Sequence, residues 1–459
     1  MKKYLGFMTL IAALVLTLVS YSNAAAAFNT GIDIVSLSSS SGTVTVEFFN
    51  SDGSSAGTLP ASTISAFGSL NYYIPTTSLA SGQYSARVSS DVPVAATVGL
   101  TDNTEQLGDN YLGTDSPDTT LTFPLIYRNF SNWNSQIVVQ NASSTEQSVN
   151  INFYKNGSTT ANASDSATIQ PYSYKIFNLN SSSYSGFGND YGVAVVTGAQ
   201  PLAGTALAVR DPGTGPANKA ELIYRAFSTS QLGTNVVAPL FYKNFNGFAS
   251  GINVVNRGSV ATNVTVVFSS ANGVAGGPWP ATRNNIQPGE GYTFYTPNVT
   301  LNGGGSLPDN LFGSATITSS ASNIAAVVSS SRFSGGSQQA FAYEAPLQSS
   351  ATGCVALPVV HNRTTWKTGI NVINLGTSSA SVTVNYSSSN PSTGDASKTY
   401  TVPAGAPYNI YMPSDAATTL GFYGGATLES NRNIIVLASH ANSGVGIALN
   451  YMGVNYTCP

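Results

Sequence analysis

The chain has 459 residues, only 8% of them charged, with 17 basic residues against 20 acidic ones. Without the two lysines at its start, the net charge is about −5. Nucleic acid is excluded as a partner, because binding to phosphates requires clustered Lys and Arg and the sequence has no such cluster. The length exceeds what one hydrophobic core usually supports, so several domains are expected.

Residues 1–27 are predicted to be a secretory signal peptide. Two lysines precede an apolar stretch from Tyr4 to Val19, and small residues follow up to Ala27. The stretch is shorter than the roughly 20 residues that cross a bilayer, and no later segment is long and apolar enough to do so. We therefore expect a secreted, extracellular or cell-surface protein that begins near Phe28 and does not insert into a membrane after cleavage.

One sequence unit recurs along the rest of the chain. Strands led by proline begin 115 and 119 residues apart, at Pro124, Pro239 and Pro358. Twelve or thirteen residues after each of them comes Ile-x-Val-x-Asn, at Ile137, Ile252 and Ile370, and the same alternation occurs at Ile32. Each unit then ends near a tyrosine, at Tyr111, Tyr224, Tyr343 and Tyr451.

The strands within a unit alternate apolar and polar residues and end in turn signals such as Asn-Gly and Asp-Gly. Seven or eight short strands in about 90 to 120 residues, without a helical period, predict an antiparallel two-sheet sandwich. A β-propeller blade would be shorter, at about 40 to 50 residues.

The recurring Val-Thr-Val-x-Phe strand and Asp-Gly turn, followed by Gly-x-Ala-x-Val and Pro-(Val/Leu)-Ala, resemble the tandem Ig-like domains of bacterial secreted and cell-surface proteins. The resemblance covers nearly the whole mature chain. It implies a scaffold without a catalytic motif, with function placed in loops and surfaces. The expected fold is all-β, with four tandem Ig-like antiparallel β-sandwich domains after the signal peptide: unit 1 (28–118), unit 2 (119–233), unit 3 (234–350) and unit 4 (351–459).

Unit 1 lacks the first strand that opens the other units, because Phe28 stands only four residues before Ile32. An open sheet edge can pair with a strand from a neighbouring molecule. One reading is therefore a homopolymer formed by strand exchange. The alternative is that the linker at 113–123 covers the edge, or that the edge is simply short.

Cys354 and Cys458 bracket unit 4. In an exported protein this lone pair predicts a disulfide, and closing a loop of about 100 residues is worth up to roughly 4 to 5 kcal/mol. The alternative, a metal site or a reactive thiol pair, lacks the histidine or carboxylate ligands that a metal would need.

An aromatic residue stands four positions before the recurring isoleucine in every unit: Phe28, Trp133, Phe248 and Trp366. Such regularity favours packing in a core or between domains over ligand binding. Trp279 differs, because it lies between prolines in a loop insertion of unit 3. It is a candidate contact for a sugar or a protein, and the alternative is a ring folded back on its own domain.

No catalytic residue, metal ligand or cofactor is assigned. Gly53-Ser-Ser-Ala-Gly57 matches the serine hydrolase motif but lacks the strand-to-helix context, and His361 and His440 are expected to have structural roles. The leading hypothesis is a rod of Ig-like repeats without catalytic activity, acting as a surface stalk, a matrix or filament subunit, or an adhesin. Its partners would be itself, other extracellular proteins or glycans. The alternative is a secreted glycan-binding protein that uses loop aromatics such as Trp279.

Overall fold

The structure is a computed structural model. It describes residues 28–458 except 334–337, 406 and the side chain of 216, and in the N-terminal segment it describes only the backbone of 8–12, 20–21 and 24–25. The predicted signal peptide as a whole therefore lies outside the described residues. No helix in the described part is long and apolar enough to span a membrane.

The protein is all-β, and its strand ladders are antiparallel and follow the sequence units. The N-terminal segment holds β1 (Met8–Ala12), β2 (Ser20–Tyr21) and β3 (Ala24–Ala25). Unit 1 contains β4 (Asn29–Ser36), β5 (Gly42–Phe49), β6 (Ser55–Thr58), β7 (Ser62–Ile64), β8 (Ser69–Tyr73), β9 (Ser85–Ser90), β10 (Val94–Asp102) and β11 (Leu107–Leu112). Unit 2 contains β12 (Asp118–Arg128), β13 (Trp133–Asn141), β14 (Gln147–Lys155), β15 (Ala163–Ile169), β16 (Tyr174–Asn178), β17 (Asp190–Arg210) and β18 (Ala220–Arg225).

Units 3 and 4 repeat this order. Unit 3 contains β19 (Asn235–Phe245), β20 (Phe248–Asn256), β21 (Thr262–Ser270), β22 (Trp279–Ile286), β23 (Gly291–Tyr295), β24 (Leu311–Ser319), β25 (Ile324–Arg332) and β26 (Gln339–Glu344). Unit 4 contains β27 (Thr352–Asn362), β28 (Trp366–Asn374), β29 (Ala380–Ser388), β30 (Ala396–Val402), β31 (Pro407–Tyr411), β32 (Phe422–Asn442), β33 (Ile447–Met452) and β34 (Val454–Asn455). The described helices are short 3₁₀ turns: Ile74–Thr76, Ser182–Phe187, Pro216–Asn218, Thr229–Gln231, Gln348–Ser350 and Met412–Ser414.

Two layers are separate in unit 1, where one sheet has the order β1-β9-β5-β6, with β7 also on β5, and the other has the order β11-β10-β4-β8. In units 2 and 4 a single strand of 21 residues, β17 or β32, continues from one layer into the other and pairs with strands of both. Alternation along the strands sends one set of side chains between the layers. In β5, for example, Val44, Val46 and Phe48 are fully buried.

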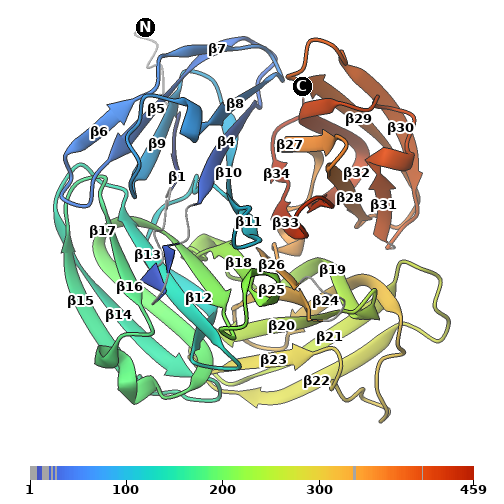
Figure 1. The fold of residues 1–459 in the computed structure, drawn as a ribbon. Coiled ribbons are helices and arrows are strands. Elements are labelled where there is room, and N and C mark those ends of the chain that lie inside the picture. The colour runs from blue at the N-terminus through green and yellow to red at the C-terminus, as the bar shows by residue number, and fades with distance from the viewer. Residues whose placement is uncertain are drawn as a thin grey trace, which may run out of the picture.

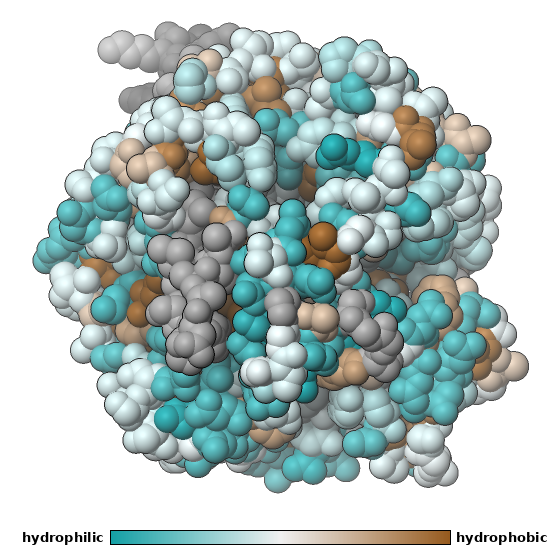
Figure 2. Space-filling view, in the orientation of Figure 1, coloured by the Kyte–Doolittle hydropathy of each residue, from teal (hydrophilic) through white to brown (hydrophobic). Residues whose placement is uncertain are grey.

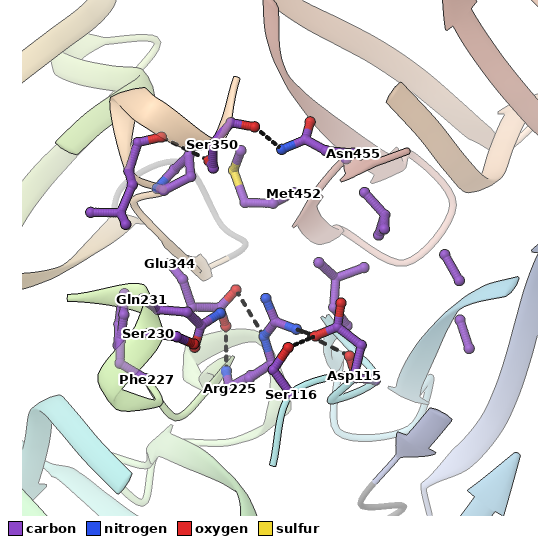
Figure 3. Close-up of a pocket in the computed structure, with 18 of the residues that line it drawn as sticks. Asp115, Ser116, Arg225, Phe227, Ser230, Gln231, Glu344, Ser350, Met452 and Asn455 are labelled. Atoms are coloured by element: carbon purple, nitrogen blue, oxygen red, sulfur yellow. Dashed lines mark hydrogen bonds and ion pairs between the residues drawn. The ribbon is translucent and has the colours of Figure 1, made fainter. Parts of the chain in front are cut away.

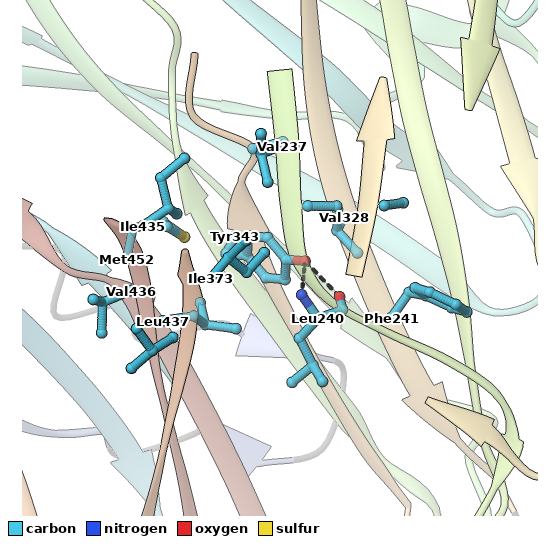
Figure 4. Close-up of a cluster of buried hydrophobic side chains, with 14 of the residues drawn as sticks. Val237, Leu240, Phe241, Val328, Tyr343, Ile373, Ile435, Val436, Leu437 and Met452 are labelled. Atoms are coloured by element: carbon cyan, nitrogen blue, oxygen red, sulfur yellow. Dashed lines mark hydrogen bonds between the residues drawn. The ribbon is translucent and has the colours of Figure 1, made fainter. Parts of the chain in front are cut away.

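The four units do not form a rod. Figure 1 shows them arranged around a common centre, with unit 4 (red) beside unit 1 (blue). Leu207 and Val209 of unit 2 pack into the core of unit 1, and Val255 and Val327 of unit 3 pack into that of unit 2. Units 3 and 4 share one apolar cluster, part of which is drawn in Figure 4. The rod expectation is therefore wrong.

The ring closes where unit 4 meets unit 1. Val35 and Ala95 of unit 1 pack with Cys354 and Tyr456 of unit 4. The hydroxyl of Tyr423 donates a hydrogen bond of 2.9 Å to the Asp33 carboxylate. The layer that contains the Ile-x-Val strands is thus apolar on both faces, as in a sheet covered on each side.

The outer surface agrees with the low charge of the sequence. The face in Figure 2 is mostly hydrophilic or neutral, and its strongly apolar areas are small and separate.

The first-strand position of unit 1 is occupied. The backbone of β1 pairs with β9 from Met8 opposite Ser90 to Ala12 opposite Ala86, where the first strands of the other units pair with β17, β24 and β32. In the full chain, the edge that the sequence suggested was open is paired with β1. Strand exchange remains a prediction for a chain that lacks this N-terminal segment.

Candidate functional site

The last strands of the four units, β11, β18, β26 and β33, meet at the centre of the ring around Asp109. The Asp109 carboxylate accepts hydrogen bonds from the backbone N–H of Ile223 (2.8 Å), Ala342 (3.1 Å), Asn450 (3.1 Å) and Asn110 (2.9 Å). Each of these residues directly precedes the closing tyrosine of its unit. One side chain therefore bonds the same backbone position in all four units. We call this group of contacts the axial hub.

The axial hub provides a hydrogen-bond acceptor for the backbone N–H groups of four sheet edges that face one another. Each closing strand pairs along one side only, and an unpaired N–H that is buried costs free energy. An ionised carboxylate offers about four acceptor positions, which matches the four N–H groups. Burial raises the pKa of Asp109 well above its ordinary value, and the four donors oppose that shift.

Glu221, on β18, is the second buried carboxyl group near the centre. It is 1% exposed, and neither carboxyl oxygen has a hydrogen-bond partner among the described residues. Burial raises the pKa of Glu221 well above its ordinary value, and the neighbouring carboxylates Asp109 and Asp102 raise it further. The two buried carboxyl groups thus differ in their surroundings: four N–H donors favour the ionised form of Asp109, whereas among the described residues no hydrogen bond favours that of Glu221.

In units 2, 3 and 4 the closing tyrosine ties the last strand of the unit to its first. The Tyr224 hydroxyl bonds both the N–H (3.0 Å) and the carbonyl of Leu125. Tyr343 does the same at Leu240, and Tyr451 at Val359. The recurrence of these tyrosines in the sequence thus has a structural cause.

A cavity of about 350 Å³ adjoins the axial hub and is lined by residues of all four units (Figure 3). The Arg225 guanidinium lies 3.9 Å from the carboxylates of both Asp115 and Glu344, and it donates to the Gly113 carbonyl at 3.1 Å. Across the cavity, the Asn455 side chain donates to the Ser350 carbonyl at 2.7 Å. These polar groups join the units and are engaged with one another.

The two histidines meet inside unit 4, with ring centroids 5.3 Å apart. Burial lowers the pKa of His440 to about 3 and that of His361 well below its ordinary value. The Nδ1 atom of His440 lies 2.8 Å from the Thr368 hydroxyl. Among the described residues, no group of three or more His, Cys, Asp or Glu could hold a metal ion.

A disulfide joins Cys354 to Cys458, with an S–S distance of 2.10 Å. It links β27, the first strand of unit 4, to the end of the chain.

Of the two readings of Trp279, a contact for a ligand or partner and a ring folded back on its own domain, the structure shows the second. The residue is 9% exposed and belongs to a core cluster. Trp279 opens β22 opposite Phe268, so its ring points inward. Because β22 is an edge strand, it tolerates Pro280, which in the sequence had suggested a loop.

The recurring aromatics pack within the protein. Phe28 and Trp133 are buried, while Phe248 and Trp366 are half-buried. Three of them lie against a ring in the preceding strand, with centroid distances of 5.4 Å for Trp133–Tyr127, 5.3 Å for Phe248–Tyr242 and 5.6 Å for Trp366–His361.

The sequence reasoning missed Asp109, although a signal was available. Two residues before the closing tyrosine, the other units have the apolar residues Leu222, Phe341 and Leu449. An aspartate at a position where the other units have a buried apolar residue indicates that its carboxyl group has hydrogen-bond partners.

No family model and no curated protein matches the chain. Among solved structures, Thermotoga maritima protein 1070 is 10% identical with a TM-score of 0.20, and the match covers 25% of this chain and 96% of that one. The serine-rich repeat protein Srr2 of Streptococcus agalactiae is 7% identical with a TM-score of 0.11, covering 56% and 85%. Domains FN1–FN3 of chicken CNTN1 are 10% identical with a TM-score of 0.10, covering 74% and 99%. Likenesses at these scores assign neither a fold family nor a function.

Proposed function

We propose that the chain is an extracellular protein without catalytic activity, in which four Ig-like sandwich units close into a ring with a structural or adhesive role. The observation that carries the proposal is the axial hub. The carboxyl group of Asp109, at the centre, accepts hydrogen bonds from the backbone of all four units. The buried residues at the centre hold the ring closed, and the outer faces and loops bind partners.

Two features support export to the extracellular space or the cell surface. The first is the predicted signal peptide at 1–27, and the second is the disulfide between Cys354 and Cys458, because disulfides persist in oxidising compartments. The partners we propose are copies of the chain, other extracellular proteins or glycans.

The ring arrangement favours some of the roles that the sequence suggested for a rod over others. A stalk must span a distance, whereas a closed ring offers a broad surface with little charge. We therefore favour a matrix or filament subunit, or an adhesin, over a stalk.

Deletion of the gene in the organism that makes the protein tests this proposal. Attachment of the cells to surfaces or to one another should fall, and added purified protein should restore it. Unchanged attachment, together with loss of an extracellular enzyme activity, would contradict the proposal.

A further inference from the structure

A second cavity, of about 360 Å³, lies between units 2 and 3. We call it the aromatic groove. Phe130, Tyr295 and Phe333 line it, and their exposed fractions of 37%, 44% and 44% are high for large apolar side chains in the described part of the chain. The groove depends on the contact between units 2 and 3, because Phe130 belongs to unit 2 and the other two residues belong to unit 3.

The turn that carries Phe130 is held in an uncommon backbone conformation. Its neighbours Asn129, Ser131 and Asn132 have φ angles of 49°, 51° and 69°. Asparagine tolerates this left-handed region, but for serine it costs on the order of 1 kcal/mol. The Phe130 ring lies on Tyr191, with a centroid distance of 4.9 Å. The strained turn thus fixes a ring whose outer face is accessible, and such strain is often found at binding sites.

Polar groups lie beside these rings. The Asn253 amide, which lines the groove, donates to the carbonyls of Gly251 (3.1 Å) and Val327 (3.2 Å), and its oxygen accepts from Thr293 at 2.8 Å. The amide oxygen has a second lone pair, and Ser131 and Ser331 also line the groove. No lining residue carries a formal charge.

We propose that the aromatic groove binds a neutral saccharide. The apolar faces of sugar rings stack on exposed aromatic rings, and their hydroxyl groups bond amides and hydroxyls, which matches an apolar site with a few orienting polar groups. No lining residue offers a countercharge to an ionic ligand, and the Arg210 guanidinium, which lies 4.6 Å from the centroid of the Phe333 ring, donates to the Asn218 carbonyl and to the Gln338 side chain. A purely apolar ligand would cover the Asn253 oxygen without using its second lone pair. The inference rests on the proposed function, for which it names the ligand.

The test is an array of neutral glycans probed with the full exported chain, followed by titration of a retained glycan against variants. We expect Phe130→Ala and Tyr295→Ala each to weaken binding about tenfold, and Tyr295→Phe, which keeps the ring, to bind nearly as the parent does. Tyr411→Ala is the matched control, because Tyr411 ends β31 as Tyr295 ends β23 and is 45% exposed, yet does not line the groove. Its affinity should not change.

Failure to retain any neutral glycan would overturn this inference, as would binding that neither alanine variant weakens. Both results leave the proposed function standing if the protein still restores cell attachment. Equal thermal unfolding of parent and variants shows that a loss of binding is not a loss of folding.

Discussion

Asp109 of unit 1 accepts a 2.8 Å hydrogen bond from the backbone N–H of Ile223 in unit 2, across 114 residues of sequence. The same carboxylate reaches Ala342 in unit 3 and Asn450 in unit 4. One side chain thus bonds the backbone of all four units, and single substitutions can test what these hydrogen bonds contribute.

Asp109→Asn should destabilise the whole ring. The amide has one acceptor oxygen in place of two, and its NH2 group would face backbone donors, so at least one buried N–H is left without a partner. We expect a loss of about 2 to 4 kcal/mol in the free energy of unfolding, measured by chemical denaturation. Asp52→Asn, in an exposed turn of unit 1, is the control. A loss as small as that of the control would show that the axial hub contributes little.

Glu221→Gln should change the pH dependence of stability. Because the folded-state pKa of Glu221 is raised, the folded chain keeps a proton that the unfolded chain releases above about pH 4.3. Stability from this group is complete below that pH and is lost as the pH rises through the folded pKa. The variant, which cannot ionise, should lose less stability as the pH rises above about 4.3.

Unfolding followed by denaturant across that pH range measures the effect of Glu221. Asp109, whose pKa is also raised, should leave part of the slope in the variant. Glu429→Gln, at an exposed site, should behave as the parent does. Identical slopes in parent and Glu221→Gln would mean that folding does not shift the pKa of Glu221.

Replacing both Cys354 and Cys458 by alanine should lower stability by about 2 to 4 kcal/mol, because their link closes a loop with a sequence separation of 104. Thermal unfolding with and without a reductant measures the effect. Reductant should lower the unfolding temperature of the parent and leave that of the double variant unchanged. Equal unfolding temperatures of parent and double variant would exclude a stabilising role.

A chain that begins at Phe28 should have an open edge along β9, because β1 pairs there in the full chain. A soluble peptide that contains residues 8–12 should raise its unfolding temperature by binding the folded state, and without peptide the chain should self-associate as its concentration rises. The same peptide with N-methylated backbone nitrogens is the control, because it cannot form the ladder. If the truncated chain stays monomeric and the peptide does not change its unfolding temperature, the edge along β9 is closed by other means.

The sequence predicted the parts of this fold that depend on local pattern. Alternation located the strands, and the recurring tyrosines marked the closing strands. Ring closure depends on contacts between neighbouring units, and the alternation of apolar and polar residues along a strand does not identify these contacts. Val35, Val255 and Ile373 follow core residues directly and face a neighbouring unit. Adjacent apolar residues in a strand are the signal for a sheet covered on both faces, and reading them so would have predicted that the units pack together.

For the sites too, local sequence patterns were informative and contacts between distant segments could not be predicted. The spacing of Cys354 and Cys458 was informative because it depended only on the ends of one unit. The aromatic groove combines Phe130 and Tyr295, which lie far apart in the sequence, and no local pattern brings them together. Trp279 misled because its flanking prolines suggested a loop where the structure has an edge strand.

The most direct test of the ring is a cross-link between units 1 and 4. The hydroxyl oxygens of Ser69 and Ser389 lie 3.0 Å apart across their interface. In a chain that carries Ser69→Cys and Ser389→Cys, mild oxidation should form a disulfide between these two positions within one molecule, detectable by mass spectrometry. Ser69→Cys paired with Ser158→Cys, on a turn of unit 2, should form none. If positions 69 and 389 stay as free thiols that react with a small maleimide, the units do not close into a ring and the account fails.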